Sequence, residues 1–196
     1  MVGMTQATSR TRHRWTRAER DALPDDGRRH EIIDGELYVS ASPRQRHQLM
    51  SARLHALLIN MCDSHPELEL MALAAPTDVA LADDTVMVPD LIVVPFGLIA
   101  ERDIPGAPLI VVEILSPSTL SVDLVIKKDR LRRAGAAQYW VADPAEPSLT
   151  IWRLEGGPGG DYVEAGRARG DQSVRVSEPF EVEIVPAELV RLPGRR

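Results

Sequence analysis

The chain has 196 residues, of which 44% are hydrophobic and 27% charged, proportions of a folded globular protein that exclude a collagen-like or wholly disordered chain. Its 23 basic and 29 acidic residues give a net charge of −6, so the surface as a whole does not indicate nucleic-acid binding. The single cysteine, Cys62, excludes an internal disulfide framework and a thiolate zinc cluster.

At about 150 residues per domain, the length predicts one domain over 15–192, between a flexible N-terminal tail at 1–14 and a C-terminal tail at 193–196. The longest apolar run, 91–100, is too short to span a bilayer. The polar N-terminus is not followed by the apolar segment of a secretory signal. We therefore expect a cytoplasmic protein without a membrane segment.

The first predicted elements are a short helix and a hairpin. Thr16 and Glu19 have the spacing of a capping box, in which a hydroxyl and a carboxylate satisfy free amides at a helix start. Two strands, 29–33 and 36–40, flank Asp34-Gly35, a dipeptide that tolerates the backbone angles of a tight turn. A small hairpin is therefore expected near the N-terminus.

The middle of the chain predicts a long helix followed by a sheet. Apolar residues at spacings of three and four indicate a helix at about 44–62 that packs against a sheet. Short apolar runs separated by Pro, Gly and Asp then predict strands at 68–74, 77–81, 86–94 and 109–115. The last two are almost continuously apolar, as central strands covered on both faces are.

The remaining elements are a second long helix and three strands. Hydroxyl residues at 116–119 can cap a helix that runs to Ala134 and stops at Gly135. Strands are predicted at 139–142, 149–154 and 162–163, and the glycine-rich segment 156–160 joins the last two as a hairpin loop. The predicted fold is α/β (α+β), with a mixed sheet flanked by helices and an N-terminal hairpin.

Two carboxylates interrupt the most apolar predicted strands. Asp90 follows Val-Pro and precedes Leu-Ile-Val-Val, and Glu113 lies within Val-Val-Glu-Ile-Leu. A carboxylate in a core strand needs a cation, an ion pair or hydrogen bonds to offset its desolvation. If the strands are neighbours, the two acids can share Mg²⁺, which takes one or two carboxylates with water and phosphate oxygens. The alternative is a buried salt bridge with an arginine.

The helix after the Glu113 strand is rich in basic residues. Lys127 lies within about 30° of the centre of its apolar stripe, and Lys128 lies about 70° away. Two carboxylates with a lysine suit metal-assisted phosphodiester hydrolysis, in which the ammonium positions the attacking water. The ordinary alternative for the basic residues is a solvated helix face.

These residues belong to a larger ordered set of segments: Glu31-Ile32-Ile33-Asp34-Gly35-Glu36, Val88-Pro89-Asp90, Val112-Glu113-Ile114-Leu115-Ser116-Pro117-Ser118-Thr119, Asp123 with Lys127, and Tyr139-Trp140-Val141-Ala142-Asp143-Pro144. The set resembles the Uma-type restriction endonuclease family of the PD-(D/E)XK nuclease superfamily, over roughly 15–192. The resemblance implies a restriction endonuclease-like core and Mg²⁺-dependent cleavage of DNA, with Mn²⁺ as a substitute.

The resemblance also implies site residues. Asp90 and Glu113 match the metal ligands, and a lysine completes the site. The superfamily places that lysine two residues after the acid, but Leu115 occupies this position, so the lysine must come from elsewhere. Lys127 matches the Asp-x-x-x-Lys spacing of the family, and Lys128 is the reserve candidate and a candidate substrate contact.

Two further residues match family positions. Glu36 is either a third acidic group of the catalytic site or an ordinary hairpin carboxylate. His47 either contacts substrate or serves packing. We assign Ser116 and Ser118 to helix capping and Asp123 to a favourable place in the first turn of a helix.

The predicted function is therefore endonucleolytic hydrolysis of DNA. The main alternative is a catalytically inactive nuclease-fold protein that binds nucleic acid or a protein partner, and a third interpretation is a structural domain whose two acids are salt-bridged. Because cutting a duplex needs two active sites or two events, a homodimer is a candidate assembly.

Overall fold

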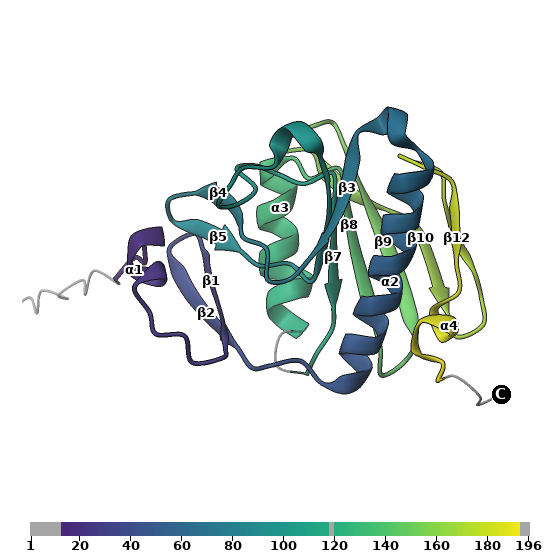
Figure 1. The fold of residues 1–196 in the computed structure, drawn as a ribbon, viewed down its shortest axis with the longest axis horizontal. Coiled ribbons are helices and arrows are strands. Elements are labelled where there is room, and N and C mark those ends of the chain that lie inside the picture. Colours follow the sequence, from purple (N-terminus) through teal and green to yellow (C-terminus); the bar gives the residue numbers. More distant parts are fainter. Residues whose placement is uncertain (1–12, 118–119, 193–196) are drawn as a thin grey trace, which may run out of the picture.

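The computed structural model describes residues 13–117 and 120–192 (Figure 1). Its helices and strands, in chain order, are α1 (Arg17–Asp21), β1 (Arg29–Ile33), β2 (Glu36–Ser40), α2 (Gln45–Ser64), β3 (Leu70–Ala74), β4 (Val79–Ala82), β5 (Thr85–Met87), β6 (Leu91–Pro95), β7 (Ile110–Ile114), a π-helical segment (Val122–Lys127), α3 (Lys128–Ala134), β8 (Gln138–Asp143), β9 (Ser148–Glu155), β10 (Asp161–Arg169), β11 (Val174–Val176), β12 (Val182–Ile184) and α4 (Pro186–Val190). Within these residues, no helix is long and apolar enough to cross a membrane.

The N-terminal region forms a small antiparallel sheet. The predicted capping box is confirmed, because the Glu19 amide donates to the Thr16 hydroxyl and the Glu19 carboxylate accepts from the Thr16 amide. The hairpin is also confirmed: Asp34 and Gly35 both have positive φ, as the turn between β1 and β2 requires. Strands β5 and β4 extend this sheet in the order β2-β1-β5-β4.

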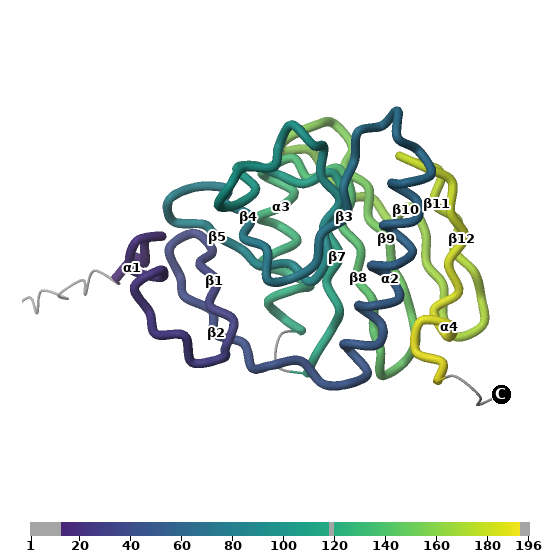
Figure 2. The backbone as a smooth tube through the Cα atoms, in the orientation of Figure 1, coloured from purple at the N-terminus to yellow at the C-terminus, as the bar shows by residue number. Residues whose placement is uncertain are grey.

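The main sheet has six strands in the order β10-β9-β8-β7-β6-β3. Only the β7–β8 pair among these neighbours is parallel, so the predicted mixed sheet is confirmed. Figure 2 shows the small N-terminal sheet and the C-terminal strands β11 and β12 at opposite ends of the long axis of the molecule.

Helices cover the two faces of the main sheet, as the continuously apolar strands predict. The cluster under α2 includes Met50, Leu54, Leu58, Val93 and Val112. The cluster on the α3 side includes Ile92, Val111, Leu131, Tyr139 and Val141, together with Ile33 and Met87 of the small sheet. Successive residues of β6 and β7 therefore enter opposite layers of the core.

The prediction of one strand over 86–94 was wrong. This segment forms β5 in the small sheet and β6 in the main sheet, separated by Val88-Pro89-Asp90. Pro89 has no amide hydrogen to donate to a ladder, which disfavours it inside a central strand. Asp90 consequently lies at the crossing between the sheets, immediately before β6, and not within a strand.

The predicted helix after Glu113 is interrupted. The turn from Val122 to Lys127 is π-helical, and α3 continues to Ala134, where Gly135 ends the helix with φ 91° as predicted. Of the hydroxyl residues predicted to cap it, Ser118 and Thr119 lie outside the described residues. A π-helical turn inside a helix is often found at functional sites, and this one carries Lys127.

Candidate metal and catalytic site

Five ionisable side chains from four segments meet where the two sheets adjoin. Glu31 comes from β1, Asp90 from the crossing before β6, Glu113 from β7, and Asp123 and Lys127 from the π-helical turn. Each is between 1% and 4% exposed. Strand pairing explains the approach of Asp90 and Glu113, because Leu91 pairs with Val112 in antiparallel register and the preceding residue therefore comes opposite Glu113.

Lys127 lies among three of these carboxylates. Its Nζ is 2.9 Å from Glu31 Oε1, 3.0 Å from Glu113 Oε1 and 3.6 Å from Asp123 Oδ1. Burial alone would lower the pKa of Lys127, but the surrounding carboxylates outweigh it and hold the pKa above its ordinary value. Lys127 is therefore a fixed positive charge at neutral pH and not a proton acceptor.

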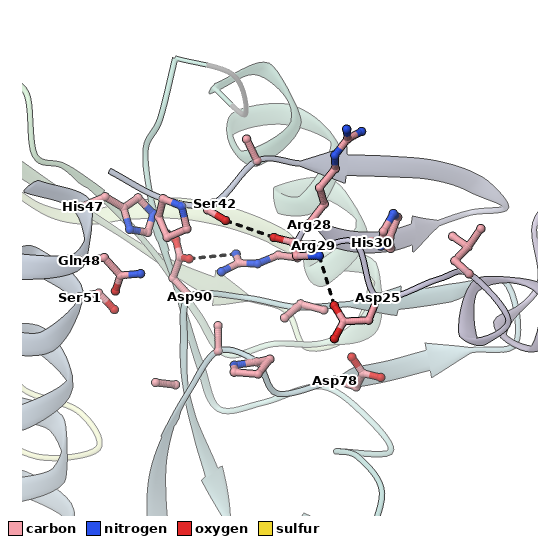
Figure 3. A pocket seen from close by; sticks show the side chains of 18 of the residues that line it. Asp25, Arg28, Arg29, His30, Ser42, His47, Gln48, Ser51, Asp78 and Asp90 are labelled. Atoms are coloured by element: carbon pink, nitrogen blue, oxygen red, sulfur yellow. Dashed lines mark hydrogen bonds and ion pairs between the residues drawn. The ribbon is translucent and has the colours of Figure 1, made fainter. Parts of the chain in front are cut away.

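Asp90 has its own set of partners. Arg29 donates to Oδ1 at 2.9 Å, and the Ile114 amide donates to Oδ2 at 2.8 Å. His47 Nε2 lies 3.2 Å from Oδ2 (Figure 3). Burial opposes ionisation of Asp90, but His47, Arg29 and the amide together hold its pKa below the ordinary value. Asp90 is thus an oriented carboxylate anion.

Glu113 behaves in the opposite way. Its burial raises the pKa well above the ordinary value, and although Lys127 opposes this, the negative charges of Asp123, Asp90 and Glu31 add to it. Four carboxylates here face two permanently charged bases, Arg29 and Lys127, which leaves an excess of two negative charges when all four are ionised. A proton on Glu113 relieves part of that excess.

A cavity of about 430 Å³ opens onto this cluster. No group of three His, Cys, Asp or Glu side chains in the described part of the chain is arranged to hold a metal ion. Mg²⁺, however, needs only one or two protein carboxylates when water and phosphate oxygens complete its shell. Asp90 and Glu113 both line the cavity, and the excess negative charge matches a divalent cation, so these residues fit such an ion.

Comparison with known proteins identifies the family. The model of the Uma2 family, described as "Putative restriction endonuclease", matches residues 17–189. The chain belongs to the Uma2 family. A crystal structure described as a putative nuclease belonging to DUF820, from Anabaena variabilis ATCC 29413, is similar with a TM-score of 0.69 and 21% sequence identity, covering 90% of this chain and 97% of that one. A search of the curated proteins found no match.

The fold of this Uma2 chain is therefore the restriction endonuclease-like one that the sequence resemblance implies. In it, Asp90, Glu113, Lys127 and His47 all line the cavity, so the structure brings together four of the predicted site residues.

Glu36 and Lys128 lie elsewhere. Glu36 is exposed beside the hairpin turn, opposite Ile33, and is not among the residues that line the cavity. Lys128 stacks over the Trp152 ring, with Nζ 2.9 Å from the ring centroid, and burial lowers its pKa. Of the two candidate lysines, only Lys127 reaches the carboxylates, as its position near the centre of the apolar stripe of its helix predicts.

Sequence reasoning missed the part played by Glu31 and Asp123. Glu31 accepts from the Val88 amide at 2.7 Å as well as pairing with Lys127. Strand alternation puts Glu31 on the same face as the buried Ile33, which is a usable signal in the hairpin. Asp123 precedes Lys127 by four residues, so the pairing of an acid and a base on one helical face could also have been anticipated.

Proposed function

We propose that this chain is a metal-dependent endonuclease that hydrolyses phosphodiester bonds in DNA, using Mg²⁺ with Mn²⁺ as a substitute. The observation that carries the proposal is the burial of Asp90, Glu113 and Lys127 together at one cavity. Membership of a family described as restriction endonucleases supports nuclease activity in general. The proposal adds the metal, the DNA substrate and the residue roles.

In this proposal Asp90 and Glu113 hold the cation. A bound Mg²⁺ would supply stabilisation of charge on the phosphate and a more acidic water. Arg29, His47 and the Ile114 amide fix the direction of the Asp90 carboxylate before substrate arrives. Lys127 donates hydrogen bonds and positions the attacking water; because its pKa is raised, it orients that water and does not take its proton.

The test is nicking of supercoiled plasmid in Mg²⁺, in Mn²⁺ and in excess chelator. We expect cleavage in either metal, none in chelator, and losses on the order of 100-fold or more in Asp90→Asn, Glu113→Gln and Lys127→Arg. Asp171→Asn is the matched control, because this acid is 89% exposed. Calorimetric titration of Mn²⁺ into wild type and Asp90→Asn reports metal binding separately. Cleavage that survives in all three variants would overturn the proposal.

A second candidate has a specific observation in its favour. Both proposed metal ligands already have basic partners, Asp90 with Arg29 and Glu113 with Lys127. A nuclease-fold protein that binds nucleic acid without cutting would have the same ion pairs. It predicts DNA binding that is unchanged by Mg²⁺ or Ca²⁺, together with no cleavage products.

Duplex cleavage adds a proposal about assembly. Since both strands must be cut, we propose a homodimer as the form that cleaves duplex DNA. Sedimentation analysis with and without DNA tests it, and a monomer that makes double-strand breaks at a rate independent of protein concentration would contradict it.

A further inference from the structure

Two arginines at the mouth of the 430 Å³ cavity differ from the basic residues inside it. Arg44 and Arg46 line the cavity and are exposed. Arg29 and Lys127, which also line it, are engaged by buried carboxylates. Within 13–117 and 120–192, Arg44 and Arg46 form no ion pair or side-chain hydrogen bond. Their positive charge is therefore available to a ligand.

Arginines without a carboxylate partner are unusual in this acidic chain. With a net charge of −6, most of the described arginines have a carboxylate partner. Examples are the pairs Arg14–Asp84, Arg20–Asp78, Arg28–Asp26 and Arg133–Asp34. A polyanion that approaches the cavity therefore meets unpaired positive charge at its mouth, whereas most of the other described arginines are already ion-paired.

The beginning of α2 adds to the same positive potential. Arg44 is the N-cap residue of this 20-residue helix; no side chain caps the helix, and its first turn contains no acidic residue. Free amides and the helix dipole favour an anion at such an end. His47, in the same turn, is 8% exposed, and its Nδ1 has no hydrogen-bond partner among the described residues, although its Nε2 contacts Asp90.

The polar face of α2 continues from this end into a neighbouring cavity. Gln48 and Ser51 follow Arg44 at spacings of four and three, so the three share one face of the helix. Gln48 and Ser51 line a second cavity of about 640 Å³, which shares Arg29, His47 and Asp90 with the first. Figure 3 shows both side chains directed into that cavity, beside His47 and Asp90.

We infer that the N-terminal half of α2 is the surface that binds the nucleic-acid backbone. Arg44 and Arg46 bind phosphates next to the bond that is cut, and the strand continues past Gln48 and Ser51 into the second cavity. Arginine suits this role because its planar guanidinium donates two hydrogen bonds to one phosphate. The contacts are to the backbone, so they confer affinity without base specificity. The inference rests on the proposed function, since it assumes a nucleic-acid substrate.

The test measures binding and not cleavage. Fluorescence anisotropy of labelled single-stranded and duplex DNA is followed in chelator and in Ca²⁺, over a range of salt concentrations. We expect Arg44→Ala/Arg46→Ala to lose affinity by about tenfold or more, and the slope of log K against log salt to fall by about one for each phosphate contact removed. Arg44→Lys/Arg46→Lys should retain most of the affinity, because it keeps both charges.

The matched control is Arg169→Ala/Arg175→Ala. It changes the net charge by the same amount at exposed residues of β10 and β11 that line neither cavity. An equal loss of affinity in this control would overturn the inference, because the effect would then be one of net charge. The inference would also be overturned if Arg44→Ala/Arg46→Ala kept the affinity and salt slope of the wild type, or if the wild type did not bind DNA.

The outcomes also separate this inference from the proposed function. If DNA binding depends on Arg44 and Arg46 but the wild type cleaves no DNA, the α2 binding surface is supported and the endonuclease is rejected. The opposite outcome is also possible to recognise. If metal-dependent cleavage needs Asp90, but Arg44→Ala/Arg46→Ala cleaves and binds DNA like the wild type, the endonuclease is supported and the α2 binding surface is rejected.

Discussion

Asp90 and Glu113 come from adjacent segments of one sheet, yet their surroundings have opposite effects. Asp90 is held by Arg29, His47 and a backbone amide, and its pKa lies below the ordinary value. Glu113 shares one lysine with Glu31 and Asp123, and its pKa lies well above. Burial disfavours the charged form of both carboxylates; the partners of Asp90 outweigh it, whereas the single lysine beside Glu113 does not, because neighbouring acids add to the effect of burial.

Removing the lysine from the Glu113 side should have the largest effect on stability. In Lys127→Met the carboxylates of Glu31, Glu113 and Asp123 lose their common partner, and breaking such a buried arrangement costs about 3–5 kcal/mol. Urea unfolding at neutral pH measures the loss. A variant as stable as wild type would mean that these acids are already neutral in the folded protein.

Asp90→Asn should cost less, at about 1.5–3 kcal/mol, since it weakens charge-assisted hydrogen bonds from Arg29 and the Ile114 amide without emptying the space. The same unfolding experiment gives the value. The difference in unfolding free energy between wild type and Asp90→Asn should shrink in acid. A carboxyl with a depressed folded pKa contributes stability that is present above the unfolded pKa and is lost as the pH falls through the folded pKa. If the difference in unfolding free energy stayed constant from neutral pH into acid, it would contradict the assignment of Asp90 as an anion.

Glu113→Gln should show the opposite pH dependence. A carboxyl whose folded pKa is raised contributes stability that is fully present below the unfolded pKa and is lost as the pH rises towards the folded pKa, by at most about 1.4 kcal/mol per pH unit. The variant should therefore gain stability relative to wild type as the pH rises above the ordinary carboxyl range. Unfolding free energies of both proteins from acid to neutral pH test this, and parallel curves would show that Glu113 titrates normally.

Lys128→Met should have the smallest effect, about 0.5–1 kcal/mol, because it removes a stacking contact with Trp152 and a weak attraction to Glu164 near the surface. It is also the adjacent-lysine control for Lys127→Met in urea unfolding. A loss as large as that of Lys127→Met would mean that the two lysines are not distinguished by their surroundings.

Local patterns were sufficient to predict the hairpin, α2 and the apolar strands of the main sheet. The capping box, the Asp34-Gly35 turn and the periodic leucines each depend on neighbours in sequence. The same holds for Lys127, which the apolar stripe of its own helix directs inward. The division of 86–94 between two sheets was only partly predictable, because Pro89 marks a break within the segment, but which sheet each half joins depends on tertiary pairing.

The place of Glu31 in the site was missed for a related reason. A carboxylate on a short hairpin is ordinarily solvated, and its burial here depends on contacts with Val88 and Lys127, which are far away in the sequence. Glu36, five residues later, has the same chemistry and lies on the partner strand opposite Ile33, but it remains exposed beside the turn. Composition does not distinguish two such acids, whereas the packing of the small sheet does.

The ion pairs Arg29–Asp90 and Glu31–Lys127 have a consequence for how the protein is made. Each joins the small sheet to a segment much later in the chain, and the first spans 61 residues. Contacts across this many residues carry an entropy cost of loop closure, which other interactions of the fold must offset. A chain still emerging from the ribosome, with its synthesis stopped before residue 127, holds Asp90 and Glu113 but lacks the ammonium between the acids. The cluster of three acids around Lys127 can therefore form only after residue 127 has been synthesised, and shorter chains lack it.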